Sequence, residues 1–594
     1  MNEKDKLLDI FPILNLPPSN YSQIIKLHRE FSKKKQKNFK IKILSNITIN
    51  SLKEILELTL WNNSINAEIT FGEYDNIIQD SLLENDNDCT IIFWELWNLS
   101  PNVASKLESL SNEEFVEIKN KLKKDLQFAI KNLQNSKLIL FNLFSNIPYN
   151  RSDGYKNRFN KLVDEANKVL EEINAKNLNL IDINQIHYLN SISHTIDLRY
   201  LHSAKSLYTH TFFRHYACIV CMNVLKTQGM VKKVLVLDCD NTLWKGVLGE
   251  EGINGIDMAS TSSLGSIFND VQLVFKNLKK KGVLICLCTK NNEKDINEVI
   301  QTHPDLLIKK EDLVYIAANW DPKPNNVIKI SKSLNLGLDS FVFIDDSNFE
   351  IGLMKEKLPE VTSLKVPEEL TNYPLFALNL SGVFNNKNLT QEDLKRTDMY
   401  KAEVLREQKL KESDSVETYL QSLEMKLSIF YDSKRYLNRI AQMTQKTNQF
   451  NLTTIRMSET DVLKYIDSDI NFVTCSSLSD RYGDSGVTAA CFVSYDEPKV
   501  ARIDNLLLSC RVLGRDVENA FLNEIIIEIS KRGANKILSK FVRSTKNMQV
   551  DSFYEKFGFV KIKDENNITL YSLEISKFKK KIIKHIKCDI KNEL

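Results

Sequence analysis

The sequence predicts a multidomain α/β protein, because strand and helix patterns alternate along two stretches and follow a different order in a third. Residues 1–228 and 229–380 contain short runs rich in Val, Ile and Leu between amphipathic segments, which is typical of a parallel sheet covered by helices. Residues 421–575 contain consecutive strand patterns and one long helix, which favours an α+β domain. We expect a polar helical linker over 381–420 and a basic helical tail over 576–594.

Each domain prediction rests on apolar runs that are short enough to be strands. In the first domain the expected strands are residues 39–49, 66–72, 89–96, 137–144 and 178–183, with helices at 51–63 and 112–134. In the second domain they are 233–238, 283–289, 313–318 and 341–346, with a helix at 266–282. The third has strands at 425–431, 469–478, 486–495 and 499–509 and a helix at 516–533. The linker pattern is helical over 390–413, and the tail pattern over 578–587.

Composition excludes several functional classes. Hydrophobic residues at 42% and charged residues at 26% are ordinary for a globular protein, and a net charge of +3 with dispersed lysines argues against nucleic-acid binding. No run reaches the roughly 20 apolar residues that span a bilayer, and we expect no signal peptide. Ten irregularly spaced cysteines predict reduced thiols and a cytoplasmic location. Cys218 and Cys221 have zinc-like spacing but no second pair, so core packing is expected.

The strands of the second domain end in polar side chains. Six such residues follow a strand or open the next helix: Asp238, Asp240, Thr289, Lys323, Asp345 and Asp346. Because the carboxyl ends of parallel strands face one crevice, these side chains should meet there. Carboxylates together suit a hard cation such as Mg²⁺, and a hydroxyl with an ammonium group suits phosphate. Taken singly, each residue is compatible with a helix cap or a strand end, but their order along the chain favours a site.

Two carboxylates spaced like Asp238 and Asp240 can divide a phosphoryl transfer between them. One can act as a covalent nucleophile, because an aspartyl phosphate splits one displacement into two steps. The other can protonate the leaving group and later activate water. The pattern therefore predicts phosphoryl chemistry at this sheet edge.

Four motifs carry a resemblance to a known family. The segments "DCDNTLW", "CTKNN", "DPKPNN" and "FIDDSNFE" resemble the motifs of the haloacid dehalogenase (HAD) superfamily, and "VLDCDNTLWKGVLGE" resembles its FkbH-like branch. The resemblance implies that Asp238 accepts the phosphoryl group and Asp240 is the acid/base. It further implies roles for Thr289 and Lys323 in phosphate binding, for Asp238, Asp345 and the backbone carbonyl of Asp240 in Mg²⁺ binding, and for Asp346 and Glu350 as supporting acids. Thr289 stands where the branch often has Ser.

The spacing of these motifs leaves no room for a cap domain. Only a loop and one helix separate Thr242 from Thr289, and only one helix and one strand separate Thr289 from Lys323. The crevice should therefore be open, with water excluded by a bulky substrate, a partner or another domain. A carrier-protein substrate would suit that geometry.

The third domain carries a second candidate phosphate site. "LLLSCRVLGRDVENAF" places Arg511, Gly514 and Arg515 between a strand and a helix start, where backbone N–H groups can hold a pyrophosphate. The loop resembles that of GNAT acyltransferases, except that Asp516 stands where the family has Gly or Ala. We expect an acyl-transfer or pantetheine-docking domain with altered ligand preference, or alternatively a structural one. The polar runs 445–454 and 479–486 are expected to line a site or a domain interface.

The first domain resembles the SGNH-hydrolase-like domain that precedes the HAD unit in FkbH-like proteins. Its catalytic residues do not carry over, because Ser45 lacks the Gly-Asp-Ser setting and Tyr200 stands where the pattern has His after Asp197. His194 and His202 are nearby and are expected to be structural. A scaffold or docking surface is the expected role.

Together the resemblances imply an enzyme that dephosphorylates 1,3-bisphosphoglycerate, a phosphorylated three-carbon donor. It would load a glyceryl unit as a thioester onto a phosphopantetheinylated acyl carrier protein in polyketide-type metabolism. Cys239 and Cys510 are candidate acyl acceptors, although flanking carboxylates should raise the pKa of Cys239 and packing is an alternative for both. Cys286 and Cys288 are expected in the core. Two other functions remain open: a stand-alone phosphatase of sugar or surface-polysaccharide metabolism, and a carrier-binding factor with a vestigial HAD site.

Overall fold

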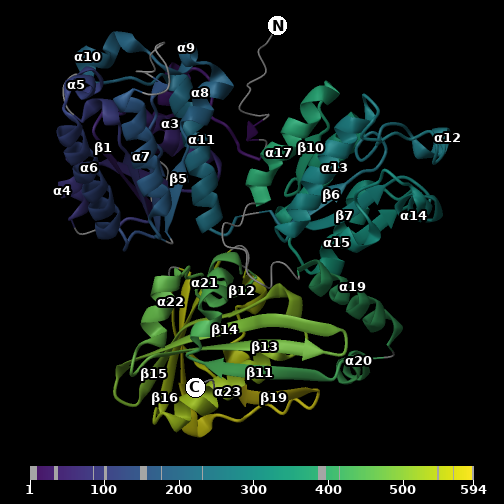
Figure 1. Cartoon of the computed structure of the whole chain (residues 1–594). Coiled ribbons are helices and arrows are strands. Elements are labelled where there is room, and N and C mark those ends of the chain that lie inside the picture. Colours follow the sequence, from purple (N-terminus) through teal and green to yellow (C-terminus); the bar gives the residue numbers. More distant parts are fainter. Residues whose placement is uncertain are drawn as a thin grey trace. The chain divides into compact units, whose positions relative to one another are not determined.

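The computed structural model divides into two compact units, Met1–Thr227 and Gln228–Leu594 (Figure 1). It describes residues 10–11, 13–32, 38–83, 86–99, 103–147, 157–175, 177–230, 232–384, 396–413, 415–447, 449–544, 547–565 and 567–591. The predicted multidomain α/β fold is confirmed, with two parallel five-stranded sheets followed by a larger mixed sheet. Within the described ranges no helix is long and apolar enough to cross a membrane.

The first unit is built on a parallel sheet of order β2-β1-β3-β4-β5. Its strands are β1 (Phe39–Ser45), β2 (Ala67–Phe71), β3 (Cys89–Phe93), β4 (Leu138–Asn142) and β5 (Leu178–Ile181). Its longer helices are α2 (Tyr21–Ser32), α3 (Leu52–Asn62), α6 (Asn112–Asn132), α7 (Arg158–Glu172) and α11 (His210–Thr227). Its shorter helices are α4 (Ile77–Ser81), η1 (Leu96–Asn98), α5 (Val103–Ser109), α8 (Asn184–Asn190), α9 (Ile192–Thr195), η3 (Leu198–Tyr200) and α10 (Leu201–Ala204). Every residue of β3 and β4 is buried, as expected for central strands covered on both faces.

The second domain repeats this plan with the order β10-β9-β6-β7-β8, all parallel. Its strands are β6 (Val234–Leu237), β7 (Leu284–Thr289), β8 (Leu313–Ala318), β9 (Phe341–Asp345) and β10 (Thr362–Lys365). Its helices are α12 (Leu248–Glu251), α13 (Gly265–Lys280), α14 (Glu293–Thr302), η4 (Lys310–Asp312), α15 (Lys323–Leu334), η5 (Leu338–Ser340), α16 (Asn348–Lys357), η6 (Leu370–Asn372) and α17 (Tyr373–Phe384). The core on one face joins the strands to α15 and α16 through buried aliphatic side chains.

The predicted linker helix is confirmed over α19 (Arg396–Glu412), while residues 390–395 lie outside the described ranges. The helix is more than a solvated connection. Tyr400 is buried in the core of the second domain, and the guanidinium of Arg406 pairs with Asp480 of the third domain, with Nη2 2.7 Å from Oδ1. Buried side chains near the start and in the middle of the helix therefore anchor it to both domains.

The third domain contains a mixed sheet of order β17-β18-β16-β15-β14-β13-β11-β19, with β12 paired to β15. Its strands are β11 (Met425–Tyr431), β12 (Phe450–Asn451), β13 (Phe472–Asp480), β14 (Gly483–Glu497), β15 (Val500–Leu508), β16 (Lys536–Val542), β17 (Val560–Glu565), β18 (Ile568–Glu574) and β19 (Ile586–Lys591). Its helices are α20 (Val416–Ser422), η7 (Lys434–Tyr436), α21 (Leu437–Lys446), α22 (Glu459–Ile466), η8 (Cys510–Val512), α23 (Val517–Lys531), η9 (Met548–Val550), η10 (Glu555–Phe557) and η11 (Ile575–Lys577).

The prediction of a helical tail over 576–594 was wrong. Residues 586–591 form β19, which pairs in parallel with β11. The lysines of this segment resemble a solvated helix face, but the β-branched Ile586 and Ile590 fit a strand better than a helix. The free edge of β11 supplies the hydrogen-bonding partner that a strand requires.

Candidate active site

Asp238 stands at the centre of the second sheet, directly after β6. The four residues of that strand are all buried, and β6 lies between β7 and β9. The backbone N–H of Asp238 continues the ladder by donating to the carbonyl of Ile344, 3.0 Å away. The sheet itself therefore places this carboxylate, and only 5% of the residue is exposed.

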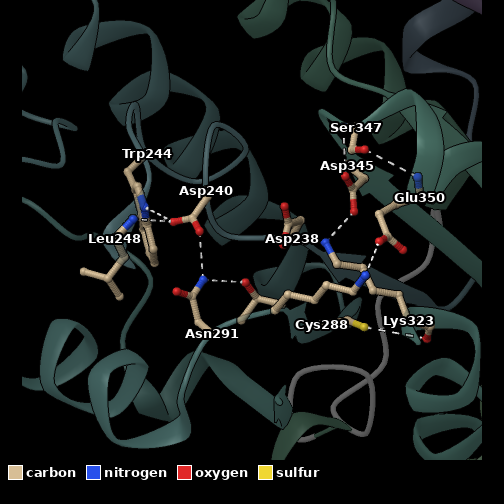
Figure 2. A network of polar contacts seen from close by, with 12 residues as sticks. Asp238, Asp240, Trp244, Leu248, Cys288, Asn291, Lys323, Asp345, Ser347 and Glu350 are labelled. Carbon is tan, nitrogen blue, oxygen red and sulfur yellow. Dashed lines mark hydrogen bonds and ion pairs between the residues drawn. The ribbon is translucent and has the colours of Figure 1, made fainter. Parts of the chain in front are cut away.

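Lys323 and Asp345 reach the same point from two other elements. Lys323 is the first residue of α15, where Pro324 favours a helix start, and Asp345 is the last residue of β9. The Nζ of Lys323 lies 2.8 Å from Asp238 Oδ1 and 2.7 Å from Asp345 Oδ2 (Figure 2). Because all three side chains are buried, both carboxylates depend on this ammonium group as their counterion.

The cluster carries more negative than positive charge. Burial raises the pKa of Asp238 to about 6, and the repulsion of Asp345 acts in the same direction against the attraction of Lys323. Burial likewise raises the pKa values of Asp345 and of Asp346. Burial alone would lower the pKa of Lys323, but the two carboxylates together raise it above its usual range. One ammonium group thus faces three carboxylates, which a further cation would stabilise.

Three carboxylates are placed so that they could share such a cation. Asp238, Asp345 and Asp346 each offer one oxygen, and these oxygens lie within 4.8 Å of one another. An all-oxygen donor set suits a hard cation, and Mg²⁺ characteristically combines one or two carboxylates with phosphate oxygens and water. Asp346, expected as a supporting acid, thus joins the group itself. The predicted role of the Asp240 backbone carbonyl in metal binding stays a prediction.

The side chain of Asp240 turns away from this group and is held by its own set of donors. Its Oδ1 accepts from the indole Nε1 of Trp244 and from the backbone N–H of Leu248, both at 3.0 Å. Its Oδ2 accepts from the amide Nδ2 of Asn291 at 2.9 Å (Figure 2). The two acids predicted for different steps therefore have different surroundings, which is what a division between nucleophile and acid/base requires.

Thr289 ends β7 and lies beside these residues. It is 1% exposed, and its Oγ1 accepts from Asn291 Nδ2 at 3.0 Å. Asn291 and Trp244 were not among the expected site residues, although Asn291 stands in the motif "CTKNN" and Trp244 in "DNTLW". Their position in those motifs was the available signal, since neither residue type is itself reactive.

Glu350 supports the site from the start of α16. Its Oε1 accepts from the Nζ of Lys290, next to Thr289, at 2.6 Å, while its Oε2 is buried without a hydrogen-bond partner among the described residues. The neighbouring Ser347 donates its backbone N–H to Asp345 Oδ1 at 2.9 Å. The loop after β9 thereby fixes the orientation of Asp345.

The cysteines near the site are buried. Cys239 is fully buried, and burial, followed by the charges of Asp238 and Asp240, raises the pKa of its thiol well above the usual value. This setting disfavours the thiolate that acyl transfer needs. Cys286 and Cys288 lie in the core, as expected, and Cys218 and Cys221 are also buried. The side chain of Cys510 lies outside the described part of the structure.

The predicted phosphate loop of the third domain is occupied by internal contacts. The Nη2 of Arg515 contacts both carboxylate oxygens of Glu403 on α19, with 2.5 Å to Oε2, and Nη1 lies 3.8 Å from Asp480 Oδ2. Arg511 donates from Nη2 to the carbonyl of Ser485 at 2.9 Å. Gly514 and Asp516 both have a positive φ, +78° and +62°, so Asp516 adopts a conformation in which Gly is favoured. The role of this loop in ligand binding stays a prediction.

The two polar runs of the third domain also make structural contacts. In the first run, Gln445 donates from Nε2 to the carbonyl of Met457 at 3.3 Å, and Asn451 is fully buried. In the second run, Asp480 accepts from Arg406, as described above, and from the backbone N–H of Tyr482 at 2.9 Å. The second run thereby contributes to the contact with α19.

The first unit does not bring a catalytic triad together among its described residues. The hydroxyl of Ser45 donates to the carbonyl of Ile47 at 2.9 Å, and His194 Nδ1 contacts Ser191 Oγ at 2.8 Å. Asp197 is paired with Arg199, with 2.6 Å between Oδ2 and Nη2. Tyr200 is 53% exposed, and His202 is exposed as well.

Comparison with solved structures places this fold among known proteins. The N-terminal part of BF1531 from Bacteroides fragilis, described as containing a phosphatase domain complexed with Mg, matches 63% of this chain over 100% of its own length, with 23% identity and a TM-score of 0.55. At this identity the match shows a shared fold.

Two acetyltransferases also match. The ribosomal-protein-S18-alanine N-acetyltransferase of Escherichia coli matches 26% of this chain over 99% of its own length, with 16% identity and a TM-score of 0.21. YncA of Salmonella typhimurium, a putative acetyltransferase solved with acetyl-CoA, matches 25% of this chain over 95% of its own length, with 13% identity and a TM-score of 0.21. No protein-family profile and no curated protein matches the chain.

Proposed function

We propose that this chain is a Mg²⁺-dependent phosphatase of the HAD type that forms a phosphoryl intermediate on Asp238. The observation that carries the proposal is the buried group of Asp238, Lys323 and Asp345 at one sheet edge, with Asp240 held nearby by separate donors. Phosphoryl transfer relies on positioning and on charge stabilisation, and this edge supplies both. The fold shared with a protein whose phosphatase domain was solved with Mg supports the same assignment.

The reaction divides into two balanced steps, which use Asp238, Asp240, Thr289 and Lys323. In the first, an oxygen of Asp238 attacks phosphorus, the bond to the leaving oxygen breaks, and that oxygen takes a proton from Asp240. In the second, water attacks the aspartyl phosphate and gives a proton to Asp240, which releases inorganic phosphate and restores Asp238. Thr289 and Lys323 hold the phosphoryl oxygens through a hydroxyl and an ammonium group.

Mg²⁺ would be held by Asp238, Asp345 and Asp346, the carboxylates that lie together. The chemistry that the bound ion would supply is neutralisation of charge on the phosphoryl oxygens. Lys323 supplies the complementary charge from the protein side, since its Nζ contacts two of the three ligands.

The substrate class that we propose is a phosphorylated three-carbon donor, 1,3-bisphosphoglycerate, with a phosphopantetheinylated acyl carrier protein as acceptor. The ester phosphate of that donor is a substrate for the Asp238 site. Its acyl phosphate is an activated acyl group, so a thiolate sulfur can add to the carbonyl carbon while phosphate leaves. The absence of room for a cap between Thr242 and Lys323 supports a large partner such as a carrier protein.

A stand-alone phosphatase is the second candidate, and one observation favours it. Arg515 belongs to the loop that was expected to hold a pyrophosphate through backbone N–H groups, and its guanidinium is paired with Glu403. In that case the third domain is structural, and the substrate is a sugar phosphate or a precursor of a surface polysaccharide.

One experiment separates these functions. Purified protein is incubated with Mg²⁺ and 1,3-bisphosphoglycerate, with and without a phosphopantetheinylated carrier, and is followed by phosphate release and intact mass. A glyceryl adduct on the carrier supports the transferase, and phosphate release without an adduct supports the phosphatase. If neither product forms, both proposals fail and a carrier-binding factor with a vestigial site remains.

A further inference from the structure

The carboxylate of Asp240 is held by three hydrogen-bond donors from three different positions. Two of them, the indole of Trp244 and the backbone N–H of Leu248, reach Oδ1 at 3.0 Å. The third, the side-chain amide of Asn291, reaches Oδ2 at 2.9 Å, as Figure 2 shows. A carboxylate bonded on both oxygens cannot rotate, so its direction is fixed before any substrate binds.

Trp244 reaches Asp240 because the loop between them is closed by the chain itself. Asn241 has a positive φ of +49°, and its Oδ1 accepts from the backbone N–H of Gly246 at 3.1 Å. Gln272 on α13 donates to the carbonyl of Leu243 at 2.7 Å and anchors the middle of the loop. Trp244 is 1% exposed, and a buried indole N–H requires an acceptor, which here is the carboxylate of Asp240.

Asn291 links Asp240 to the phosphate-binding hydroxyl. Its single amide nitrogen lies 2.9 Å from Asp240 Oδ2 and 3.0 Å from Thr289 Oγ1. An amide NH₂ group has two hydrogens, so it can donate to both oxygens at once. Thr289 accepts this bond through its oxygen, so its hydroxyl hydrogen can be donated to a phosphoryl oxygen in place of the neighbouring Cys239 thiol.

We propose that Trp244 and Asn291 are positioning residues that hold the acid/base Asp240 and the phosphate-binding Thr289 in a fixed relation. The inference rests on the proposed function and deepens it. Trp244 acts on Asp240 alone, and Asn291 acts on Asp240 and Thr289 together. The two residues should therefore affect proton delivery to the leaving group more than any other part of the reaction.

The test compares two substrates of similar shape whose leaving groups differ in their need for a proton. p-Nitrophenyl phosphate releases a stable phenolate, whereas phenyl phosphate releases a more basic one that must be protonated. Trp244→Phe removes the indole N–H and keeps an aromatic ring. We expect it to lower kcat/KM for phenyl phosphate about 10-fold more than for p-nitrophenyl phosphate, because general-acid catalysis contributes 10²–10⁴-fold when fully in place.

Asn291→Asp is the second variant, since it is nearly isosteric and removes the two donated hydrogens, while the negative charge that it adds is matched by a control below. We expect the same leaving-group dependence, together with a higher KM for both substrates because Thr289 loses its donor. Wild-type kinetics for this variant would contradict the proposal. Circular dichroism and thermal unfolding of each variant establish that the domain is folded.

Two matched controls lie on the same sheet edge. Trp320→Phe removes an exposed indole N–H whose partner is Asn292 Oδ1, at 3.2 Å. Asn292→Asp adds the same negative charge one residue beyond Asn291, at an exposed position that donates to Asp295. We expect both controls to leave the ratio of the kcat/KM values for the two substrates unchanged. If a control shifts that ratio as strongly as its partner variant, the effect belongs to packing or charge and the inference is overturned.

Failure of this inference is distinguishable from failure of the proposed function. If Asp238→Asn still turns over either ester, the proposed function fails whatever the leaving-group ratio. If the wild type releases phosphate neither from these esters nor from 1,3-bisphosphoglycerate, the proposed function fails and the inference falls with it. A third outcome is that Asp238→Asn is inactive, while Trp244→Phe and Asn291→Asp lower kcat/KM equally for both substrates. In that case the phosphatase function stands and the positioning role is wrong.

Discussion

The two parallel sheets of this protein both end their central strands in buried polar groups, yet the two edges differ in charge. In the second domain, Asp238 and Asp345 share the ammonium group of Lys323. In the first unit, Asn46 follows β1 and Glu95 follows β3. The amide of Asn46 exchanges two hydrogen bonds of 2.8 Å with the backbone of Glu95.

The acid of the first unit is kept neutral rather than paired. Glu95 is fully buried, and burial raises its pKa to about 8, although a hydrogen bond of 2.6 Å from the hydroxyl of Tyr208 opposes the shift. Its Oε2 has no hydrogen-bond partner within the described part of the chain. A protonated acid satisfies this setting at neutral pH without any cation.

Sheet topology therefore places polar groups at an edge but does not decide their chemistry. Both edges lie at the carboxyl ends of parallel strands, where α/β proteins characteristically bind ligands. The difference is one cation, Lys323, which opens the helix after β8. Its charge opposes the rise that burial causes in the pKa values of Asp238 and Asp345, whereas no cation opposes the rise in the pKa of Glu95.

The largest expected effect is the loss of chemistry at the charged edge alone. Asp238→Asn should lower phosphate release at least about 10³-fold, because the nucleophile is removed. Glu95→Gln should leave phosphate release at the wild-type rate, since no step uses that residue. Steady-state assays of both variants check the contrast, and a comparable loss in Glu95→Gln would show that both edges contribute to catalysis.

Removal of the cation should make the charged edge unstable. Lys323→Met leaves Asp238 and Asp345 buried without their counterion, and breaking a buried ion pair costs about 3–5 kcal/mol. Urea unfolding should show this decrease in the free energy of unfolding of the second domain, and added Mg²⁺ should restore part of it. Lys329→Met, which removes an exposed ion pair with Asp321, is the control and should change stability by less than about 1 kcal/mol.

The neutral edge should show its charge state in the pH dependence of stability. The pKa of Glu95 in the folded protein, about 8, lies above the ordinary value of 4.5. The contribution of Glu95 to the free energy of unfolding is therefore complete below pH 4.5 and is lost as pH rises through 8. Glu95→Gln mimics the protonated acid and should lack this loss. The free energy of unfolding of the variant, measured relative to the wild type, should therefore increase by on the order of 3 kcal/mol between pH 5 and pH 8, at about 1.4 kcal/mol per pKa unit.

Denaturant unfolding at the two pH values measures this gain. Glu117→Gln, at an exposed position of α6, serves as the control and should follow the wild type. A Glu95→Gln variant that loses stability equally at both pH values would show that the acid is ionised and paired in the folded state.

The smallest expected effect is a loss of stability at low pH that involves His187, whereas Glu95 causes a loss at high pH. His187 of the first unit is buried, with Nδ1 2.7 Å from Thr195 Oγ1, and burial lowers its pKa to about 4. Its contribution is therefore complete above the ordinary pKa of about 6.5 and is lost as pH falls through 4. The free energy of unfolding should fall between pH 7 and pH 5 by about 1–2 kcal/mol less in His187→Gln than in the wild type. Thermal unfolding at both pH values checks this, and an unchanged slope would assign the sensitivity to other groups.

The charged edge could largely be predicted from sequence, because strand ends in a parallel sheet follow from apolar runs. Asp238, Thr289 and Asp345 each close such a run, and Lys323 opens the helix after another. Asp346 was expected to have a secondary role, since the sequence does not show which of two adjacent acids turns toward the others.

The contacts of Trp244 and Asn291 could not be predicted, because they depend on loop conformation. Trp244 meets Asp240 only through a left-handed residue at Asn241, and helix or strand periodicity carries no information on such loops. Glu95 was missed for a related reason. It lies at the end of an apolar run expected as strand 89–96, whereas β3 ends at Phe93, so the acid falls at the sheet edge rather than within the strand.

The parallel pairing of β19 with β11 has a practical consequence for handling the protein. Residues 586–591 cover an edge whose backbone groups would otherwise be open to a second molecule. Lys587 and Lys591 place positive charge on the new outer edge, and charged side chains oppose intermolecular strand addition. Shortened versions that stop before Ile586 would uncover the edge of β11, and we expect them to self-associate, so affinity tags belong after this segment and not in place of it.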